Sequence, residues 1–120
     1  MLSLESDPAK IDAWRRNVSE AGLEQWAELV EGDAFATLPA IGDVFDVVFL
    51  DAEKKDYERL FRLARLRVSR PAASSSQTTS SHQETLGVYS KARQEDPTLV
   101  STTVPLDRGL ELSVVLSESL

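Results

Sequence analysis

The chain has 120 residues, enough for one domain with a single modest core. Its composition is 42% hydrophobic and 28% charged, with no apolar run long enough to cross a bilayer. The absence of cysteine excludes disulfide scaffolds, thiolate zinc sites and cysteine nucleophiles. A net charge of −7 opposes binding to a phosphate backbone. We therefore expect a cytoplasmic protein without a secretion signal that binds neither nucleic acid nor a membrane.

The N-terminal third predicts two short strands separated by a helix. Apolar residues recur at three- and four-residue spacing after Asp7-Pro8, a pair that opens helices, and Gly22 supplies the helix end. The expected elements are a strand at residues 2–5, a helix from about Pro8 to Ala21, a strand at 27–31, and a Gly32-Asp33-Ala34 turn into a short helix ending near Pro39.

The rest of the chain continues the alternation and then changes character. The expected elements are a strand from Val44 to Leu50, helices at about 54–68 and 84–95, and strands at 98–104 and 110–116 that form a closing antiparallel hairpin. The strand at 44–50 is almost continuously apolar, as in a parallel sheet covered by helices on both faces. This order predicts an α/β fold with a doubly wound, Rossmann-like sheet, whose ligands bind beyond the carboxyl ends of the strands.

One stretch breaks the pattern. Residues 69–83 are polar and of low complexity, although the alternation of strands and helices requires another central strand there. Their composition predicts a flexible or disordered linker.

Several motifs follow the strand ends, and together they resemble the class I S-adenosylmethionine-dependent O-methyltransferases of the catechol type, a family that includes caffeoyl-CoA and bacterial members. The matching segments are Glu5 with Asp7-Pro8, Gly32-Asp33-Ala34, Asp51-Ala-Glu-Lys54 with Tyr57, and the C-terminal Asp96-Pro-Thr-Leu-Val and Pro105-Leu-Asp-Arg-Gly. The resemblance covers most of the chain outside residues 69–83.

The resemblance implies a site for S-adenosylmethionine at three of these strand ends. Glu5 would accept hydrogen bonds from the ribose hydroxyls, Asp33 and the Ala34 amide would face the adenine, and Asp51 would also line the cofactor. On local sequence alone, a Gly-Asp-Ala turn more often caps a short helix.

The resemblance also implies metal-assisted catalysis. Asp51 would bind Mg²⁺ or another divalent cation, which brings the two hydroxyls of a catechol together and lowers their pKa, and Lys54 would take the proton. The alternative from periodicity is that Asp51 caps a helix whose solvated first turn contains Lys54.

Two parts of the family pattern are missing. Relatives carry several helices and a first strand with a glycine-rich turn before the position of Leu2, so we expect residues 1–120 to be an N-terminally truncated, partial methyltransferase domain with exposed sheet edges. Relatives also have a strand near Gly-Gly-Leu-Val-Val-Ala-Asp-Asn-Val, whose Asp-Asn pair completes the metal site. Here residues 72–80 are Ala-Ala-Ser-Ser-Ser-Gln-Thr-Thr-Ser, and we hypothesise that this disrupted stretch is frame-shifted.

The predicted function is therefore methyl transfer from S-adenosylmethionine to a phenolic or catecholic hydroxyl, with the activity of this chain left open. The alternative is a non-catalytic, truncated remnant that acts through protein–protein association, including formation of a homo-oligomer.

Overall fold

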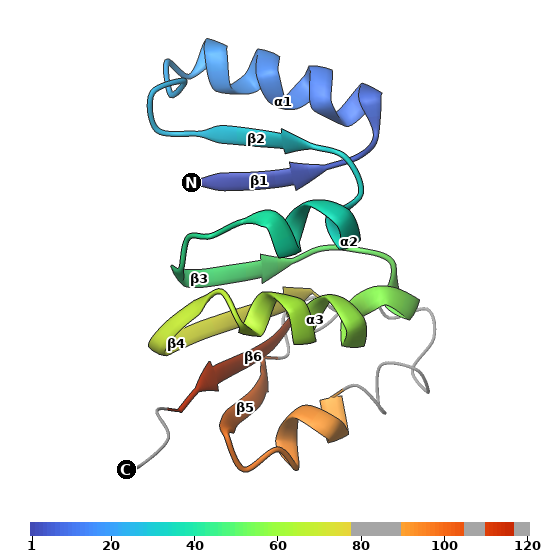
Figure 1. The fold of residues 1–120 in the computed structure, drawn as a ribbon, viewed down its shortest axis with the longest axis vertical. Coiled ribbons are helices and arrows are strands. Elements are labelled where there is room, and N and C mark those ends of the chain that lie inside the picture. The colour runs from blue at the N-terminus through green and yellow to red at the C-terminus, as the bar shows by residue number, and fades with distance from the viewer. Residues whose placement is uncertain (78–89, 105–109, 117–120) are drawn as a thin grey trace. The chain divides into compact units, whose positions relative to one another are not determined.

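The computed structural model describes residues 1–77, 90–104 and 110–116 (Figure 1). The chain divides into two compact units, Met1–Gly42 and Asp43–Leu120. The first unit has a two-stranded sheet and the second a four-stranded sheet. None of the described helices has the length and apolarity that a bilayer crossing requires.

The first unit consists of two parallel strands joined by a helix. Strand β1 (Leu2–Glu5) pairs with β2 (Glu28–Glu31), and helix α1 (Pro8–Glu20) connects them (Figure 1). The helix begins as expected from its sequence, because the carboxylate of Asp7 accepts a hydrogen bond from the Ala9 amide at 2.9 Å. These elements confirm the predicted strand-helix-strand order.

Helix α1 is attached to both strands of its sheet. Ile11 is buried, the indole nitrogen of Trp14 donates to the Ser3 hydroxyl at 3.1 Å, and Arg15 forms an ion pair with Glu31. The unit ends in a short helix α2 (Ala34–Thr37) and a 3-10 turn η1 (Leu38–Ala40), in which Leu38 is buried.

The second unit is a mixed four-stranded sheet with strand order β3-β4-β6-β5. Strands β3 and β4 are parallel, whereas β6 is antiparallel to both β4 and β5, which confirms the C-terminal hairpin. Its elements are β3 (Phe45–Leu50), the 3-10 turn η2 (Lys54–Asp56), α3 (Tyr57–Arg65), β4 (Val68–Gln77), β5 (Leu99–Val104) and β6 (Leu110–Val115). Residues 90–94 are helical, and the remainder of the helix expected at 84–95 lies outside the described residues.

Two expectations for the middle of the chain are wrong. The helix predicted to reach Val68 ends at Arg65, and residues 69–77, predicted as a flexible linker, belong to strand β4. Residues 73–76 of β4 pair with β3 on one side and with β6 on the other, so backbone pairing makes this segment a strand whatever its side chains are. Residues 78–83 of the predicted linker lie outside the described residues.

Helix α3 supplies the core of the second unit. Tyr57, Leu60, Phe61 and Ala64 recur at helical spacing and are all buried. On β3, Leu50 is buried, but Val47 and Phe49 on the alternate face are 62% and 54% exposed. Within the described part of this unit, α3 contacts β3 and β4.

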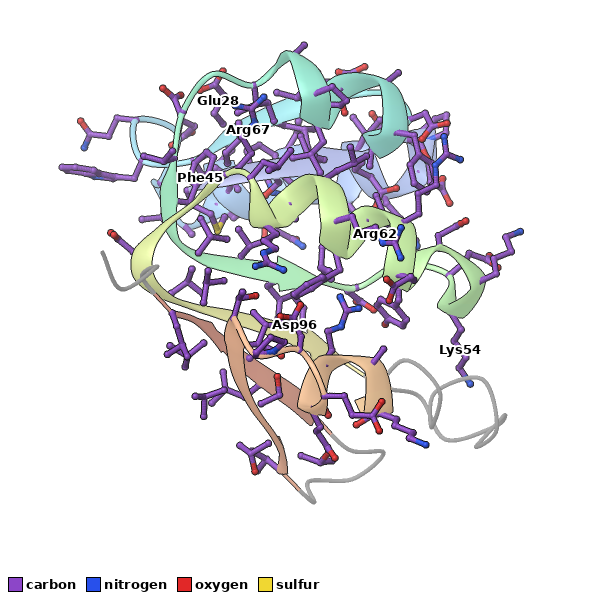
Figure 2. The ribbon with its side chains drawn as sticks, turned by 60° about the horizontal axis from the view of Figure 1, so that its bottom comes forward. Glu28, Phe45, Lys54, Arg62, Arg67 and Asp96 are labelled. Carbon is purple, nitrogen blue, oxygen red and sulfur yellow. The ribbon has the colours of Figure 1, made fainter. Side chains whose placement is uncertain are left out.

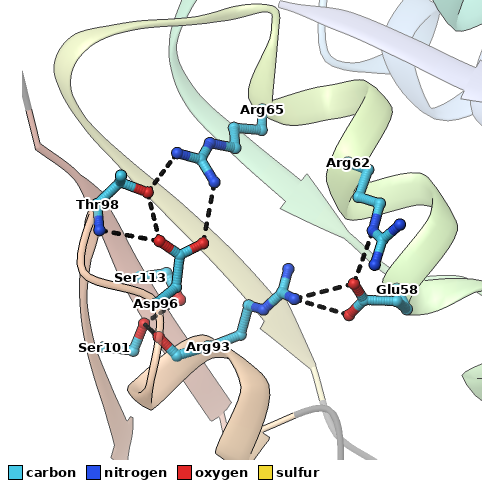
Figure 3. Close-up of polar contacts among 8 residues, drawn as sticks. All are labelled: Glu58, Arg62, Arg65, Arg93, Asp96, Thr98, Ser101 and Ser113. Atoms are coloured by element: carbon cyan, nitrogen blue, oxygen red, sulfur yellow. Dashed lines mark hydrogen bonds and ion pairs between the residues drawn. The ribbon is translucent and has the colours of Figure 1, made fainter. Parts of the chain in front are cut away.

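A polar network joins α3 to the segment that precedes β5 (Figure 3). One guanidinium nitrogen of the buried Arg93 donates to both carboxylate oxygens of Glu58, at 3.0 and 2.8 Å, and the group lies 4.2 Å from the centre of the Phe61 ring. Arg65 forms an ion pair with Asp96 at 3.0 Å. The hydrogen bond from Thr98 and the charge of Arg65 hold the pKa of Asp96 below its usual range, against the effect of its partial burial.

Candidate functional site

The first unit brings two predicted cofactor residues to one edge of its sheet. Glu5 ends β1, and Gly32-Asp33 follows the end of β2 directly. The Gly32 amide donates to the Glu5 carbonyl at 2.9 Å and thereby joins the two strand ends. Glu5 and Asp33 therefore lie together at the carboxyl edge, where parallel sheets bind ligands.

The Glu5 carboxylate is held by the turn that follows β1. Its Oε1 accepts hydrogen bonds from the Ser6 and Asp7 amides, both at 2.9 Å. Within the described part of the chain its Oε2 has no hydrogen-bond partner. One oxygen thus fixes the orientation of the group, and the other is left to accept hydrogen bonds from a ligand.

Asp33 caps helix α2, as the simpler sequence interpretation expected. Its Oδ1 accepts from the Phe35 amide at 2.8 Å, and Ala34 is the first helical residue. Capping uses one carboxylate oxygen only, so this contact is compatible with a second partner at Oδ2. The cap therefore fixes the side chain of Asp33 relative to the strand end.

Gly32 sets the direction of the chain at this edge. Its φ is +126°, and a Cβ added there would lie 3.3 Å from Cγ2 of Thr37. We expect Gly32→Ala to lower the free energy of unfolding of the first unit by about 1–2 kcal/mol, because an L side chain disfavours that backbone conformation. Urea denaturation of this variant measures the effect.

Gly42→Ala is the matched control for this prediction, since a Cβ at Gly42 would meet no atom within 4 Å. Equal stabilities for Gly32→Ala and the wild-type chain would contradict the strained turn.

The second unit places Asp51 and Lys54 just beyond the end of β3. Asp51 is exposed, and its side chain makes no hydrogen bond or ion pair with the described residues. The residue that caps η2 is Glu53, so the alternative role of Asp51 as a helix cap is wrong. Lys54 begins η2 with a partly exposed side chain that extends away from α3 (Figure 2). Tyr57 is 2% exposed and anchors the start of α3.

Two curated proteins match the chain in sequence, whereas no protein-family model does. The chain is 35% identical over 75 residues to a catechol O-methyltransferase of Niastella koreensis, a match that covers 59% of this chain and 34% of that protein. It is 39% identical over 57 residues to a catechol O-methyltransferase of Mycobacterium tuberculosis, covering 47% of this chain and 26% of that protein. The chain is therefore similar in sequence to part of two catechol O-methyltransferases.

A solved structure shows how far this fold matches that of a known protein. The O-methyltransferase TomG from Streptomyces achromogenes, in complex with SAM, aligns with a TM-score of 0.85 and 18% identity over 97% of this chain and 61% of that one. The predicted Rossmann-like methyltransferase fold is confirmed. The sequence matches span about a third or less of the curated relatives, at 34% and 26% of their lengths.

The described residues do not fit a divalent cation. They contain no group of three or more His, Asp or Glu side chains that could hold one. Leu50 pairs with Ser76, so the next residues along the two parallel strands are Asp51 and Gln77. His82 lies outside the described residues.

The predicted site residues are thus divided between the two units of the chain. Glu5, Asp33 and Ala34 belong to the first unit, and Asp51 and Lys54 belong to the second. Within each unit the residues stand at the carboxyl end of a parallel strand.

Proposed function

We propose that this chain supplies cofactor-binding and acceptor-activating residues to an O-methyltransferase that transfers the methyl group of S-adenosylmethionine to a phenolic or catecholic hydroxyl. The observation that carries the proposal is the joined edge of the first unit, where Gly32 bonds to the Glu5 carbonyl and Asp33 follows. Sequence similarity to catechol O-methyltransferases supports the choice of acceptor.

The cofactor roles follow from the carboxylate oxygens of Glu5 and Asp33 that do not accept hydrogen bonds from the neighbouring backbone amides. Glu5 Oε2 accepts hydrogen bonds from the ribose hydroxyls, while its Oε1 stays bound to the Ser6 and Asp7 amides. Asp33 and the Ala34 amide offer an acceptor and a donor to the adenine edge. Because both acidic groups are held by backbone amides, little side-chain entropy is lost on binding.

The acceptor role falls to Lys54 in the second unit. As the hydroxyl oxygen attacks the methyl carbon, the bond from carbon to the cofactor sulfur breaks and the sulfur leaves as a neutral thioether. Lys54 would accept the proton of that hydroxyl. Asp51, three residues earlier and exposed, would accept a hydrogen bond from the neighbouring hydroxyl of a catechol and so orient the acceptor.

Calorimetric titration with S-adenosylmethionine tests the cofactor roles. We expect Glu5→Gln to weaken cofactor binding about tenfold, because a hydrogen bond to a charged acceptor contributes on the order of 1.5 kcal/mol. Glu28→Gln, at the opposite end of the same sheet, is the matched control and should leave the affinity unchanged. Equal affinities for Glu5→Gln and the wild type, or no cofactor binding by the wild type, would contradict the assignment.

The second candidate function is association with another copy of the chain through β3. This strand ends its sheet, and Val47 and Phe49 expose apolar surface on it, as open sheet edges that pair with other chains do. Sedimentation at increasing concentration tests this function, since Val47→Lys should then shift the chain toward the monomer. A monomer at every concentration contradicts it.

A further inference from the structure

Two turns form the cofactor edge, which is the carboxyl edge of the β1-β2 sheet in the first unit. One turn follows Glu5 at the end of β1, and the other follows Glu31 at the end of β2, directly before Gly32. Glu5 and Glu31 are register partners on parallel strands. Partners of this kind lie about 5 Å apart and share one face of the sheet. Two carboxylates therefore leave the same face of the sheet as neighbours.

Helix α1 packs on this face and supplies a cation to it. The indole nitrogen of Trp14 donates to the hydroxyl of Ser3, which lies two residues before Glu5 and so on the same face of β1. The next residue of the helix, Arg15, forms an ion pair with Glu31. Arg15 therefore neutralises one of the two neighbouring carboxylates.

The contacts of α1 and of the two strands form a closed chain around the cofactor edge. Asp7, at the end of the turn after Glu5, caps α1 by accepting from the Ala9 amide at 2.9 Å. Arg15 of the same helix binds Glu31, and the amide of the following residue, Gly32, donates to the Glu5 carbonyl at 2.9 Å. Each turn is thus fixed to the helix as well as to the other strand.

We propose that Arg15 is a positioning residue for the cofactor, because it holds the Glu31 carboxylate toward α1 and away from Glu5, whose Oε2 then stays oriented for the ribose hydroxyls. The inference rests on the proposed cofactor role of Glu5. Without Arg15, Glu31 would be an uncompensated carboxylate beside Glu5, and like charges opposite each other on paired strands repel.

The ion pair should act on ligand affinity rather than on folding. The side chains of Arg15 and Glu31 are 58% and 49% exposed, and ion pairs exposed to this degree stabilise a fold only slightly. A purely structural role would instead change the stability of the first unit. Stability and affinity therefore have to be measured on the same variants.

Calorimetric titration of the full chain with S-adenosylhomocysteine tests the effect on affinity. This ligand has no net charge at neutral pH, so its binding reports the orientation of Glu5 and not the attraction of a cation to added negative charge. We expect Arg15→Gln to weaken binding about threefold to fivefold. The double variant Arg15→Gln with Glu31→Gln, which removes both charges, should restore the affinity, and Arg15→Lys should retain most of it.

Arg16→Gln is the matched control, since Arg16 is exposed on the same helix and forms no ion pair with the described residues. It should leave the affinity unchanged, and all of these variants should unfold at the temperature of the wild type. Equal affinities for Arg15→Gln and the wild type, no rescue by the double variant, or a loss of affinity that follows a loss of stability would overturn the inference.

A measurement without ligand separates this inference from the proposed function. The amides of Ser6 and Asp7 donate to Oε1 of Glu5, so their NMR shifts report the orientation of that carboxylate. We expect Arg15→Gln to move both shifts and the double variant to restore them. Unchanged shifts in Arg15→Gln would overturn the inference, whereas moved shifts in a chain that binds no cofactor would contradict only the proposed function.

Discussion

Glu58→Ala is expected to lower the free energy of unfolding of the second unit by about 3 kcal/mol, because it removes the carboxylate that compensates a buried guanidinium. The Arg93 side chain is 7% exposed, and both oxygens of Glu58 accept hydrogen bonds from it (Figure 3). A loss of this size is a large part of the stability of a small domain, about 5–15 kcal/mol in total. Urea denaturation monitored by circular dichroism measures it.

Glu95→Ala is the control for this prediction. It removes the ion pair between Lys91, whose side chain is 73% exposed, and Glu95, whose side chain is 66% exposed. Surface ion pairs of this kind contribute about 0–1 kcal/mol to the free energy of unfolding. If Glu58→Ala were no more destabilising than Glu95→Ala, the Arg93 pair would not stabilise the contact between α3 and the 90–98 segment.

Phe61→Ala is expected to lower the free energy of unfolding by about 3–5 kcal/mol, because it opens a cavity in the core under α3. Phe61 is 2% exposed, and its ring also carries the guanidinium of Arg93 at 4.2 Å from its centre. Phe49→Ala, at a position that is 54% exposed, is the matched control and should cost far less. Equal losses in thermal unfolding experiments would show that α3 does not form the core of this unit.

Most of the fold could be predicted because its elements obey local rules. The Asp7-Pro8 pair specifies the start of α1 through backbone conformation, and the apolar run of β3 specifies a strand through burial. Both elements lie close to their predicted bounds. The C-terminal hairpin followed from two strands around a glycine-containing loop. The alternation of strands and helices required a strand where β4 lies, but the polar residues of β4 carry no strand signal of their own, and only the pairing with β3 and β6 makes them a strand.

The polar contacts of the second unit also had no signal in the sequence. Arg93 and Glu111 are charged residues in ordinary surroundings, yet both are buried. Glu111 accepts hydrogen bonds from the hydroxyls of Ser90 and Thr103, both at 2.8 Å; Thr103 is its cross-strand partner in the hairpin, whereas Ser90 is 21 residues away. Long-range pairs of this kind depend on the tertiary fold, which periodicity does not describe.

The candidate site was predictable in part. The sequence placed Glu5, Asp33 and Asp51 at strand ends, and the structure has all of them there. The joining of Glu5 to Gly32 and the neutral residue beside Asp51 depend on strand register, which follows from pairing rather than from local sequence.

Amide-resolved NMR of the full chain, titrated with S-adenosylmethionine and then with Mn²⁺, tests whether the cofactor binds at the edge of the first unit and whether a cation binds at Asp51. We predict saturable shifts at the amides of Ser6, Gly32 and Ala34, which surround the Glu5 and Asp33 carboxylates, and no localised Mn²⁺ broadening around Asp51. If S-adenosylmethionine caused no shifts in the first unit, the proposed cofactor edge would be wrong. If Mn²⁺ caused saturable broadening around Asp51, the statement that the chain has no cation site there would be wrong.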